Sequence, residues 1–184
     1  LNSNYPSLST VCDKKVFLMA DSSLAKSGKP WFLPESAESF AYRPHLVFRV
    51  GRLGKNIARR FAHRYIDAVT IGASVEASPM PDSAIANAFD GAAMIGDFIP
   101  IEEIPDINNI TGMMGVEGGE TTSLCSADMI CKIDEIIEYL SQYFTFKIGD
   151  IIYSGFGTEA VTLAIDQVLR GSINGKEVLN IKVK

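Results

Sequence analysis

Apolar and polar residues alternate most clearly between Phe40 and Val50, at the start of a longer stretch that reaches Phe98. Because successive side chains of a strand point to opposite faces, this alternation predicts a strand with two different faces. One face would carry Arg43, His45, Val47 and Arg49, and the other Tyr42, Leu46 and Phe48. Pro44 has no backbone N–H, so we expect it at a sheet edge or a bulge.

A glycine-containing turn follows, and the period then changes from two to that of a helix. We predict a helix from Ile57 to Ile66, with Asn56 as its N-cap. The next segment, Ala68 to Glu76, has the composition of a strand, and Ser74 and Glu76 would lie on one of its faces. A loop is predicted from Ser78 to Ala86.

The second half of the chain contains the clearest helix pattern. Apolar residues recur every three to four positions from Lys132 to Phe144, which predicts an amphipathic helix. Strands are expected at Ile151 to Ser154 and, as antiparallel pairs, from Val161 to Lys184, where Asn174-Gly175 is a hairpin signal. Val16 to Ala20 also has the length of a strand, whereas residues 101–122 show no period and are expected to be loop or irregular strand.

Length and composition favour a single domain. With 184 residues, 47% of them hydrophobic, the chain is long enough for one substantial core, and we expect one domain over residues 1–184. A net charge of -5 argues against nucleic acid or an anionic membrane surface as a partner, because both require a concentrated basic face. The basic residues Arg59, Arg60, His63 and Arg64 are expected on a solvated helix face.

The cysteines and the apolar runs indicate where the protein would reside. Cys12, Cys125 and Cys131 lack the close spacings of zinc or redox motifs, and we expect reduced thiols. No apolar run approaches the roughly 20 residues that span a bilayer, and no secretory signal is apparent. We therefore expect a cytoplasmic protein that has no membrane partner.

Taken one by one, the candidate chemical residues are sparse. The two histidines are His45 on the predicted strand and His63 on the predicted helix, and no Gly-x-Ser-x-Gly motif marks a nucleophile. Gly155-Phe156-Gly157 is too short for a phosphate-binding motif and reads as a turn between strands. The interesting feature is His45, because it shares a strand face with Arg43.

Several segments together resemble one known family. The runs, in chain order, are VFLMADSSLAKSGKPWF, LVFRVGRLGKNI, AHRYIDAVTIG, NAFDGAAMIGDFIP and KIDEIIEYLSQYFTFKIGDIIYSG. They closely resemble the small members of the fumarylacetoacetate hydrolase family, over nearly the whole chain. The resemblance implies a mixed α+β fold, a β-roll of mixed sheets with short flanking helices, which is usually dimeric.

The family resemblance also implies a magnesium or manganese ion that chelates a 2-oxo acid or its enol. Such an ion requires hard oxygen ligands, which the family supplies as a Glu-x-Glu pair and an Asp on a neighbouring strand. In this sequence the pair falls on Arg43 and His45, and the Asp falls on Ser74. A divalent ion would be repelled by Arg43, so we expect no metal cofactor.

Other pocket positions differ in part from the family's pattern. The family's lysine ahead of Phe-Asp-Gly falls on Asn87, although Asp90 matches, and its substrate-binding threonine falls on Phe156. Glu76 lies on the same predicted face as Ser74 and could pair with Arg43. Glu117 or Glu120 could instead rebuild a metal site, and the sequence leaves this open.

Two functions remain possible. The favoured one is a non-catalytic pseudoenzyme with a binding or structural role, as a homodimer whose further partner would be a small anionic ligand or an active paralogous subunit. The alternative is a hydrolase, isomerase or decarboxylase that acts on a 2-oxo acid without metal, in which Arg43 binds a carboxylate and His45 transfers a proton.

Overall fold

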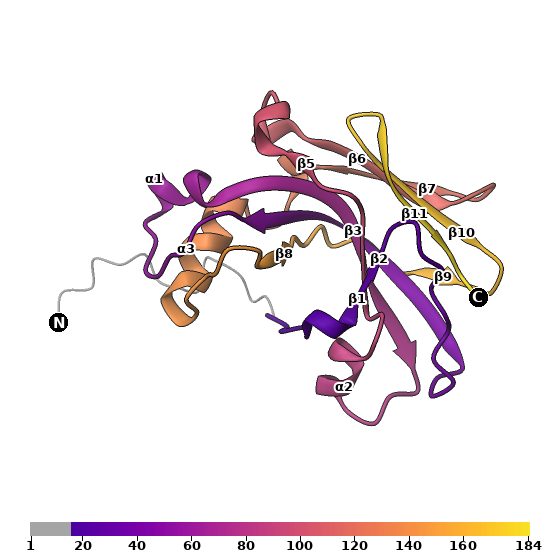
Figure 1. Ribbon diagram of the computed structural model, residues 1–184. Helices are drawn as coiled ribbons and strands as arrows, with labels where there is room; N and C mark the ends of the chain where they lie inside the picture. The colour runs from indigo at the N-terminus through magenta and orange to yellow at the C-terminus, as the bar shows by residue number, and fades with distance from the viewer. Residues whose placement is uncertain (1–15) are drawn as a thin grey trace.

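Two β-sheets pack against each other, with short helices at the ends of the longer sheet (Figure 1). In this computed structural model, residues 16–184 are described. The first sheet has the strand order β1-β4-β3-β2-β8, with β5 beside β3 and β9 beside β2, and the second has the order β11-β10-β6-β7. The strand pairs are mostly antiparallel, and β1 and β4 are parallel. The mixed α+β class expected from the sequence is confirmed.

The elements follow one another in the order β1 Leu24–Lys26, β2 Ser39–Val50, α1 Arg59–Ala62, β3 Ile66–Ser78, α2 Ser83–Ala88, β4 Ala93–Ile95, β5 Ile99–Pro100, β6 Thr111–Val116, β7 Thr121–Cys125, α3 Ile133–Tyr143, β8 Ile151–Tyr153, β9 Val161–Leu163, β10 Val168–Ile173 and β11 Lys176–Lys182.

The long strands β2 and β3 form the centre of the first sheet. They pair from Ser39 opposite Ser78 to Val50 opposite Ile66. Both predicted strands are confirmed, and each is slightly longer than its pattern indicated. The alternation of faces is also confirmed, because the side chains of Tyr42, Leu46 and Phe48 are completely buried.

Close approach of the two sheets depends on small residues in the second sheet. A Cβ atom on Gly171 of β10 would lie 2.6 Å from Cγ2 of Ile71, and one on Gly112 of β6 would lie 3.2 Å from Cδ1 of the same residue. Ile71 is fully buried and belongs to one continuous apolar cluster. The glycines thus let the sheets pack closely around Ile71.

The second half of the chain largely follows its pattern. The helix predicted at Lys132 to Phe144 is α3, and the strand predicted at Ile151 to Ser154 is β8. Asn174 and Gly175 join β10 to β11 with φ angles of 48° and 81°. Two adjacent residues with positive φ are what a two-residue hairpin turn of type I′ requires.

The helix predicted at Ile57 to Ile66 is wrong in its length and its cap. The α-helix begins at Arg59 and continues as a 3₁₀ turn over His63–Tyr65. Ala58 is its N-cap, whereas Asn56 has a φ of 51° and lies in the preceding turn. An N-cap needs extended backbone, so a left-handed Asn56 cannot fill that role.

The loop predicted from Ser78 to Ala86 missed a helix, whereas the loop or irregular strand expected over residues 101–122 is in part a strand. The segment after Ser78 contains α2, in which the Asp82 side chain accepts hydrogen bonds from the N–H groups of Ala84 and Ile85 at 2.8 and 2.9 Å. Residues 101–122 contain β6 and the start of β7. Gly112 of β6 packs against the other sheet and Gly115 against Glu120 and Thr121, so this strand lacks the apolar alternation that would reveal it.

Two further expectations were wrong. Residues 16–20 form no strand, and Val16, Phe17 and Leu18 are about half exposed or more. Cys131 is disulfide-bonded, although Cys125 is free as expected. Spacing along the chain does not show which thiols the fold brings together. Among the described residues, no helix combines the length and the apolar character that a membrane span needs.

Replacing Ile71 by Ala tests the role of this residue between the sheets. Ile71 is fully buried whereas Ile148 is 74% exposed, so Ile71→Ala should lower the free energy of unfolding by about 2–5 kcal/mol. Ile148→Ala removes the same atoms at the surface and should change it by less than about 0.5 kcal/mol. Urea denaturation measures both, and equal losses would contradict the packing described.

Candidate functional site

The candidate site lies where strand pairing along one edge of β2 is interrupted. On that edge β2 pairs with β9 over residues 40–42 and with β8 over residues 47–49. Pro44 lies between these pairings and is opposite Ala73 of β3 on its other side. The expectation of an edge position for Pro44 is therefore confirmed. The chain between β8 and β9, residues 154–160, passes this gap and turns backbone carbonyl groups toward it.

Arg43 makes one contact with β3 and one across this gap. Its Nε donates a hydrogen bond to Oε1 of Glu76 on β3, and its Nη1 donates to the carbonyl oxygen of Thr158. The pairing of Arg43 with Glu76 that the sequence suggested is confirmed. The two side chains are 39% and 52% exposed, so the ion pair contributes no more than about 1 kcal/mol.

His45 is held from both sides. Its Nδ1 lies 2.6 Å from the carbonyl oxygen of Ser154, and its Nε2 lies 2.8 Å from Oγ of Ser74. A carbonyl oxygen only accepts, so Nδ1 of the neutral ring carries the proton and donates it. Nε2 then accepts the hydroxyl hydrogen of Ser74. The ring also meets Tyr153 edge to face, at 5.7 Å between centroids.

The surroundings of His45 keep its imidazole neutral. Burial lowers the pKa of His45 below its ordinary value, and the positive charge of Arg43 lowers it further. The hydrogen bond to the Ser154 carbonyl opposes them but does not outweigh burial. A neutral imidazole with a defined tautomer can accept a proton at Nε2.

Gly72 makes room for this arrangement. It pairs with His45 across the two strands. A Cβ atom on Gly72 would lie 2.5 Å from the carbonyl oxygen of Met94 and 3.0 Å from Cε1 of Tyr153. The Tyr153 hydroxyl donates to that same carbonyl at 3.0 Å, and burial raises the pKa of Tyr153. Any side chain at position 72 would displace the ring that packs on His45.

The structure thus brings Arg43, His45, Ser74 and Glu76 together on one face of the β2–β3 pair. The other proposed pocket positions are less closely connected to these four residues. Phe156 lies in the segment that passes the gap. Asn87 bonds to the Ser83 carbonyl within α2, and within residues 16–184 no hydrogen bond or ion pair links Asn87 or Asp90 to the four.

Sequence reasoning missed the groups that residues 153–158 contribute. The carbonyl oxygens of Ser154 and Thr158 bind His45 and Arg43, but a carbonyl group is present at every residue and leaves no sequence signal. The one available clue was Pro44, which marks the place where the strand edge is open.

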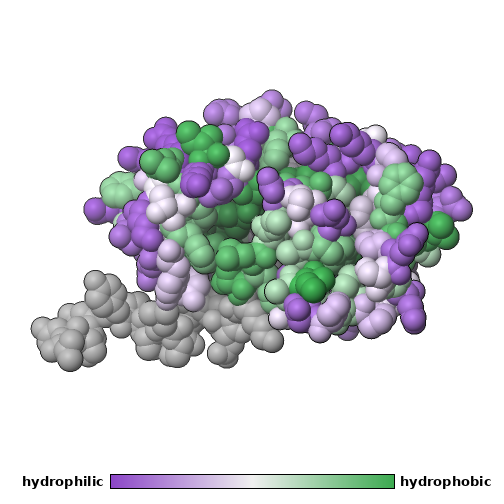
Figure 2. All heavy atoms as spheres, turned by 60° about the horizontal axis from the view of Figure 1, so that its bottom comes forward, coloured by the Kyte–Doolittle hydropathy of each residue, from purple (hydrophilic) through white to green (hydrophobic). Residues whose placement is uncertain are grey.

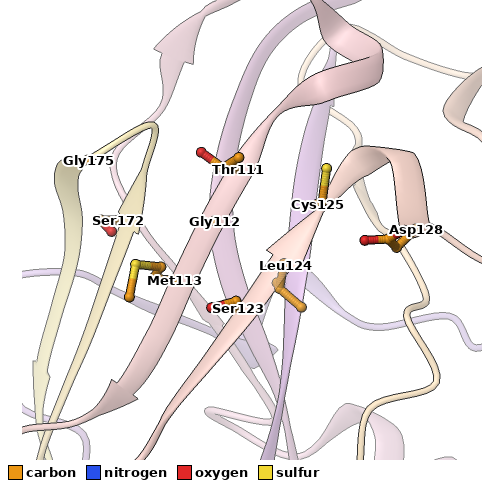
Figure 3. Close-up of a pocket in the computed structure, with 9 residues that line it drawn as sticks. All are labelled: Thr111, Gly112, Met113, Ser123, Leu124, Cys125, Asp128, Ser172 and Gly175. Carbon is orange, nitrogen blue, oxygen red and sulfur yellow. The ribbon is translucent and has the colours of Figure 1, made fainter.

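Two faces of the molecule are hollowed. One hollow is bordered largely by apolar residues (Figure 2). A separate, open hollow of about 300 Å³ lies on the second sheet. Figure 3 shows side chains from three strands around it, among them Met113, Ser123 and Ser172. None of the predicted site residues lines this second hollow.

Comparison with known proteins agrees with the fold. A family model described as fumarylacetoacetate (FAA) hydrolase C-terminal matches residues 2–177. The chain belongs to this family. The resemblance noted in the sequence is thereby confirmed at the level of the family.

Relatives within the family are named for several related reactions. The mitochondrial oxaloacetate tautomerase fahd-1 of Caenorhabditis elegans is 24% identical over 148 residues, which cover 76% of this chain and 69% of the relative. An Escherichia coli homoprotocatechuate catabolism bifunctional isomerase/decarboxylase is 27% identical and matches 76% of this chain, which spans only about a third (34%) of that protein.

Solved structures show the same fold. A 2-hydroxyhepta-2,4-diene-1,7-dioate isomerase from Mycobacterium marinum has a TM-score of 0.82 at 22% identity, covering 91% of this chain and 67% of its own. A fumarylpyruvate hydrolase from Pseudomonas aeruginosa, in complex with Mn²⁺ and pyruvate, has a TM-score of 0.77 at 19% identity, with coverages of 88% and 75%. At these identities the likeness establishes the fold alone.

The residues at the family's metal position do not fit a divalent ion. Arg43 only donates hydrogen bonds, and Nε2 of His45 accepts one from Ser74. Within residues 16–184 no three His, Cys, Asp or Glu side chains are grouped so that they could hold a metal ion. Mg²⁺ and Mn²⁺ require several oxygen ligands, preferably carboxylates. The carboxylate of Glu76 on this face is paired with Arg43.

Glu117 and Glu120, which could have rebuilt a metal site, lie elsewhere. Both belong to the turn between β6 and β7 of the second sheet. Oε1 of Glu117 accepts a hydrogen bond from Nη2 of Arg170 at 3.1 Å. Neither glutamate contributes to the face that carries Arg43 and His45.

Thermal unfolding with excess Mg²⁺ or Mn²⁺ tests the donor set. We expect no change in Tm, because the described residues form no suitable site. Binding at 100 times its dissociation constant would add roughly 2.7 kcal/mol, which raises Tm by about 5–10 °C for a chain of this size. As a matched control, the triple variant Arg43→Glu, His45→Glu, Ser74→Asp restores three carboxylates and should gain such a shift. A clear rise for the unmodified protein would contradict the site as described.

The lowered pKa of His45 predicts a specific pH dependence of stability. Between the folded-state pKa and about 6.5, the unfolded chain binds one more proton than the folded chain. The free energy of unfolding should therefore fall as the pH drops from 7 through 6, by at most about 1.4 kcal/mol per unit from this residue. Urea denaturation at several pH values should show that His45→Gln removes this contribution. His63→Gln, which alters the exposed histidine, should retain it, and equal slopes in both variants would contradict the prediction.

Proposed function

We propose that this chain acts on a small 2-oxo acid without a divalent ion, with Arg43 binding a substrate carboxylate and His45 transferring a proton. The observation that carries the proposal is the oriented, neutral imidazole of His45 beside the guanidinium of Arg43. The names of the relatives also support it, because they describe tautomerase, isomerase and hydrolase reactions of oxo or hydroxy-diene acids.

Arg43 retains capacity for a ligand. A guanidinium has five N–H donors, and the bonds to Glu76 and Thr158 use two of them. The ion pair with Glu76 is half exposed, so exchanging it for a substrate carboxylate costs little. A planar carboxylate bound by two parallel hydrogen bonds would be fixed in orientation as well as in position.

His45 can act on a substrate through Ser74. Tautomerisation and isomerisation of a 2-oxo acid both begin when a proton leaves the carbon next to the keto group. Nε2 of His45 accepts the Ser74 hydroxyl hydrogen, so the proton reaches the imidazole either by way of that hydroxyl or after it rotates away. General base catalysis of this kind contributes about 10²- to 10⁴-fold to the rate.

The non-catalytic role favoured by the sequence is the second candidate. Arg43 already has protein partners in Glu76 and the Thr158 carbonyl, as expected if its task is to stabilise an emptied pocket. In that case the chain would act as a homodimer, or with an active paralogous subunit, and His45 would be a structural residue. This proposal requires that substitution of His45 leaves the biological function intact.

A keto–enol assay in the presence of EDTA separates the two candidates. The conversion of oxaloacetate, the substrate named for the tautomerase relatives, can be followed by ultraviolet absorbance. We expect His45→Gln to lower kcat by about 10²- to 10⁴-fold and Arg43→Gln mainly to raise KM. His63→Gln is the matched control and should leave the rate unchanged. If the unmodified protein is no faster than buffer with this and with acylpyruvate substrates, the second candidate is correct.

A further inference from the structure

Ser74, His45 and the Ser154 carbonyl form a chain of hydrogen bonds with the layout of a nucleophile, a base and an orienting group. Oγ of Ser74 lies 2.8 Å from Nε2 of His45, and Nδ1 lies 2.6 Å from the carbonyl oxygen. We propose that Ser74 is a covalent nucleophile that accepts an acyl group, and that the substrates are small acyl compounds carrying a carboxylate, such as 2,4-dioxo acids. This inference rests on the proposed function, since it uses the same face and the same base.

The direction of the hydrogen bonds favours a reactive hydroxyl. Because Nδ1 donates to a carbonyl, Nε2 has its lone pair directed at the Ser74 hydroxyl hydrogen. A serine whose proton can pass to a neutral imidazole is the activated form used in nucleophilic catalysis. The orienting acceptor is a backbone carbonyl rather than a carboxylate, but it fixes the same tautomer and ring orientation.

The scaffold places Ser74 beside the substrate-binding cation. Ser74 of β3 is the Cα partner of Arg43 of β2, and Glu76 is two residues further along the same face. Directly opposite residues on one sheet face have Cβ atoms about 4.5–5.5 Å apart. A carboxylate held by Arg43 would therefore place the rest of a short substrate within reach of Ser74. Both residues lie on long paired strands, which hold them more precisely than loops would.

The other serines near this site lack a base. Ser154 donates its hydroxyl to the Leu46 carbonyl at 2.7 Å and is buried. Ser78, at the end of β3, is exposed. Within residues 16–184, Ser74 is the serine whose hydroxyl bonds to an imidazole. Ser74 and His45 are only partly buried, so a ligand on this face of the sheet can approach them.

The proposed reaction is balanced with water as the co-reactant. Oγ of Ser74 forms a bond to the acyl carbonyl carbon while its proton passes to Nε2 of His45. The carbon–carbon bond to the oxo-acid fragment then breaks, its electron pair forms the enolate of that fragment, and the enolate takes the proton from His45. Water next gives a proton to His45 and its hydroxide to the acyl carbon. Ser74 leaves as the alkoxide and regains the proton, and the products are a carboxylic acid and a 2-oxo acid.

Covalent labelling with a fluorophosphonate tests whether Ser74 is nucleophilic. Attack on phosphorus releases fluoride and leaves a stable adduct, which intact mass and peptide mapping locate. We expect one adduct per chain at Ser74, none in Ser74→Ala, and labelling at least about 100-fold slower in His45→Gln. Ser78→Ala, an exposed serine of the same strand, should label at the unmodified rate. The Tm of each variant is measured alongside its labelling rate, so that loss of folding is not mistaken for loss of reactivity.

The outcomes separate this inference from the function on which it rests. Absence of an adduct at Ser74 in the folded protein, or labelling that does not depend on His45, overturns the nucleophile. If metal-free keto–enol turnover nevertheless requires His45 and survives in Ser74→Ala, the proposed function stands without it. If Ser74 is labelled but no 2-oxo acid is turned over, the nucleophile is supported and the proposed substrate class is wrong.

Discussion

The antiparallel pairing of β2 with β3 is the constraint on which the rest of the structure depends. It runs from Ser39 opposite Ser78 to Val50 opposite Ile66, and four strands of the first sheet (β4, β5, β8 and β9) pair directly with one of these two, while β1 attaches through β4. Because side chains alternate along both strands, the register of this pair decides which side chains face the core and which face outward. Tyr42, Leu46 and Ile71 are turned into the core, and the polar face is turned outward as a unit.

A local break in this sheet creates the candidate site. Pro44 cannot donate to a ladder, and no strand pairs with residues 43–46 on the outer edge of β2, although the Leu46 carbonyl accepts a hydrogen bond from the Ser154 N–H. The passing chain contributes carbonyl oxygens in place of ladder hydrogen bonds, and these bind the side chains of Arg43 and His45. Backbone groups that a regular strand would use for pairing thus become orienting groups for polar side chains.

Electrostatics distinguishes this face from one that binds a divalent ion. Arg43 supplies positive charge permanently, with Glu76 beside it, whereas a metal site concentrates negative charge to attract a cation. The same cation keeps His45 neutral together with burial. The fold of the fumarylacetoacetate hydrolase family is retained, and its face carries Arg43 and the hydrogen-bonded imidazole of His45. Fold membership alone therefore does not determine the reaction.

The sequence by itself determined the features that depend on local periodicity. The alternation in β2, the helical period of α3 and the Asn174-Gly175 turn each follow from the chain's own geometry, and the shared face of Arg43, Ser74 and Glu76 followed from alternation plus the family resemblance.

Tertiary structure alone decided the partners of His45, because carbonyl oxygens carry no sequence signal. It also decided β6, in which Gly112 allows the close approach of Ile71, and the short α1, whose start is limited by the left-handed turn at Asn56. Such features depend on contacts between residues distant in sequence, which a local pattern cannot encode.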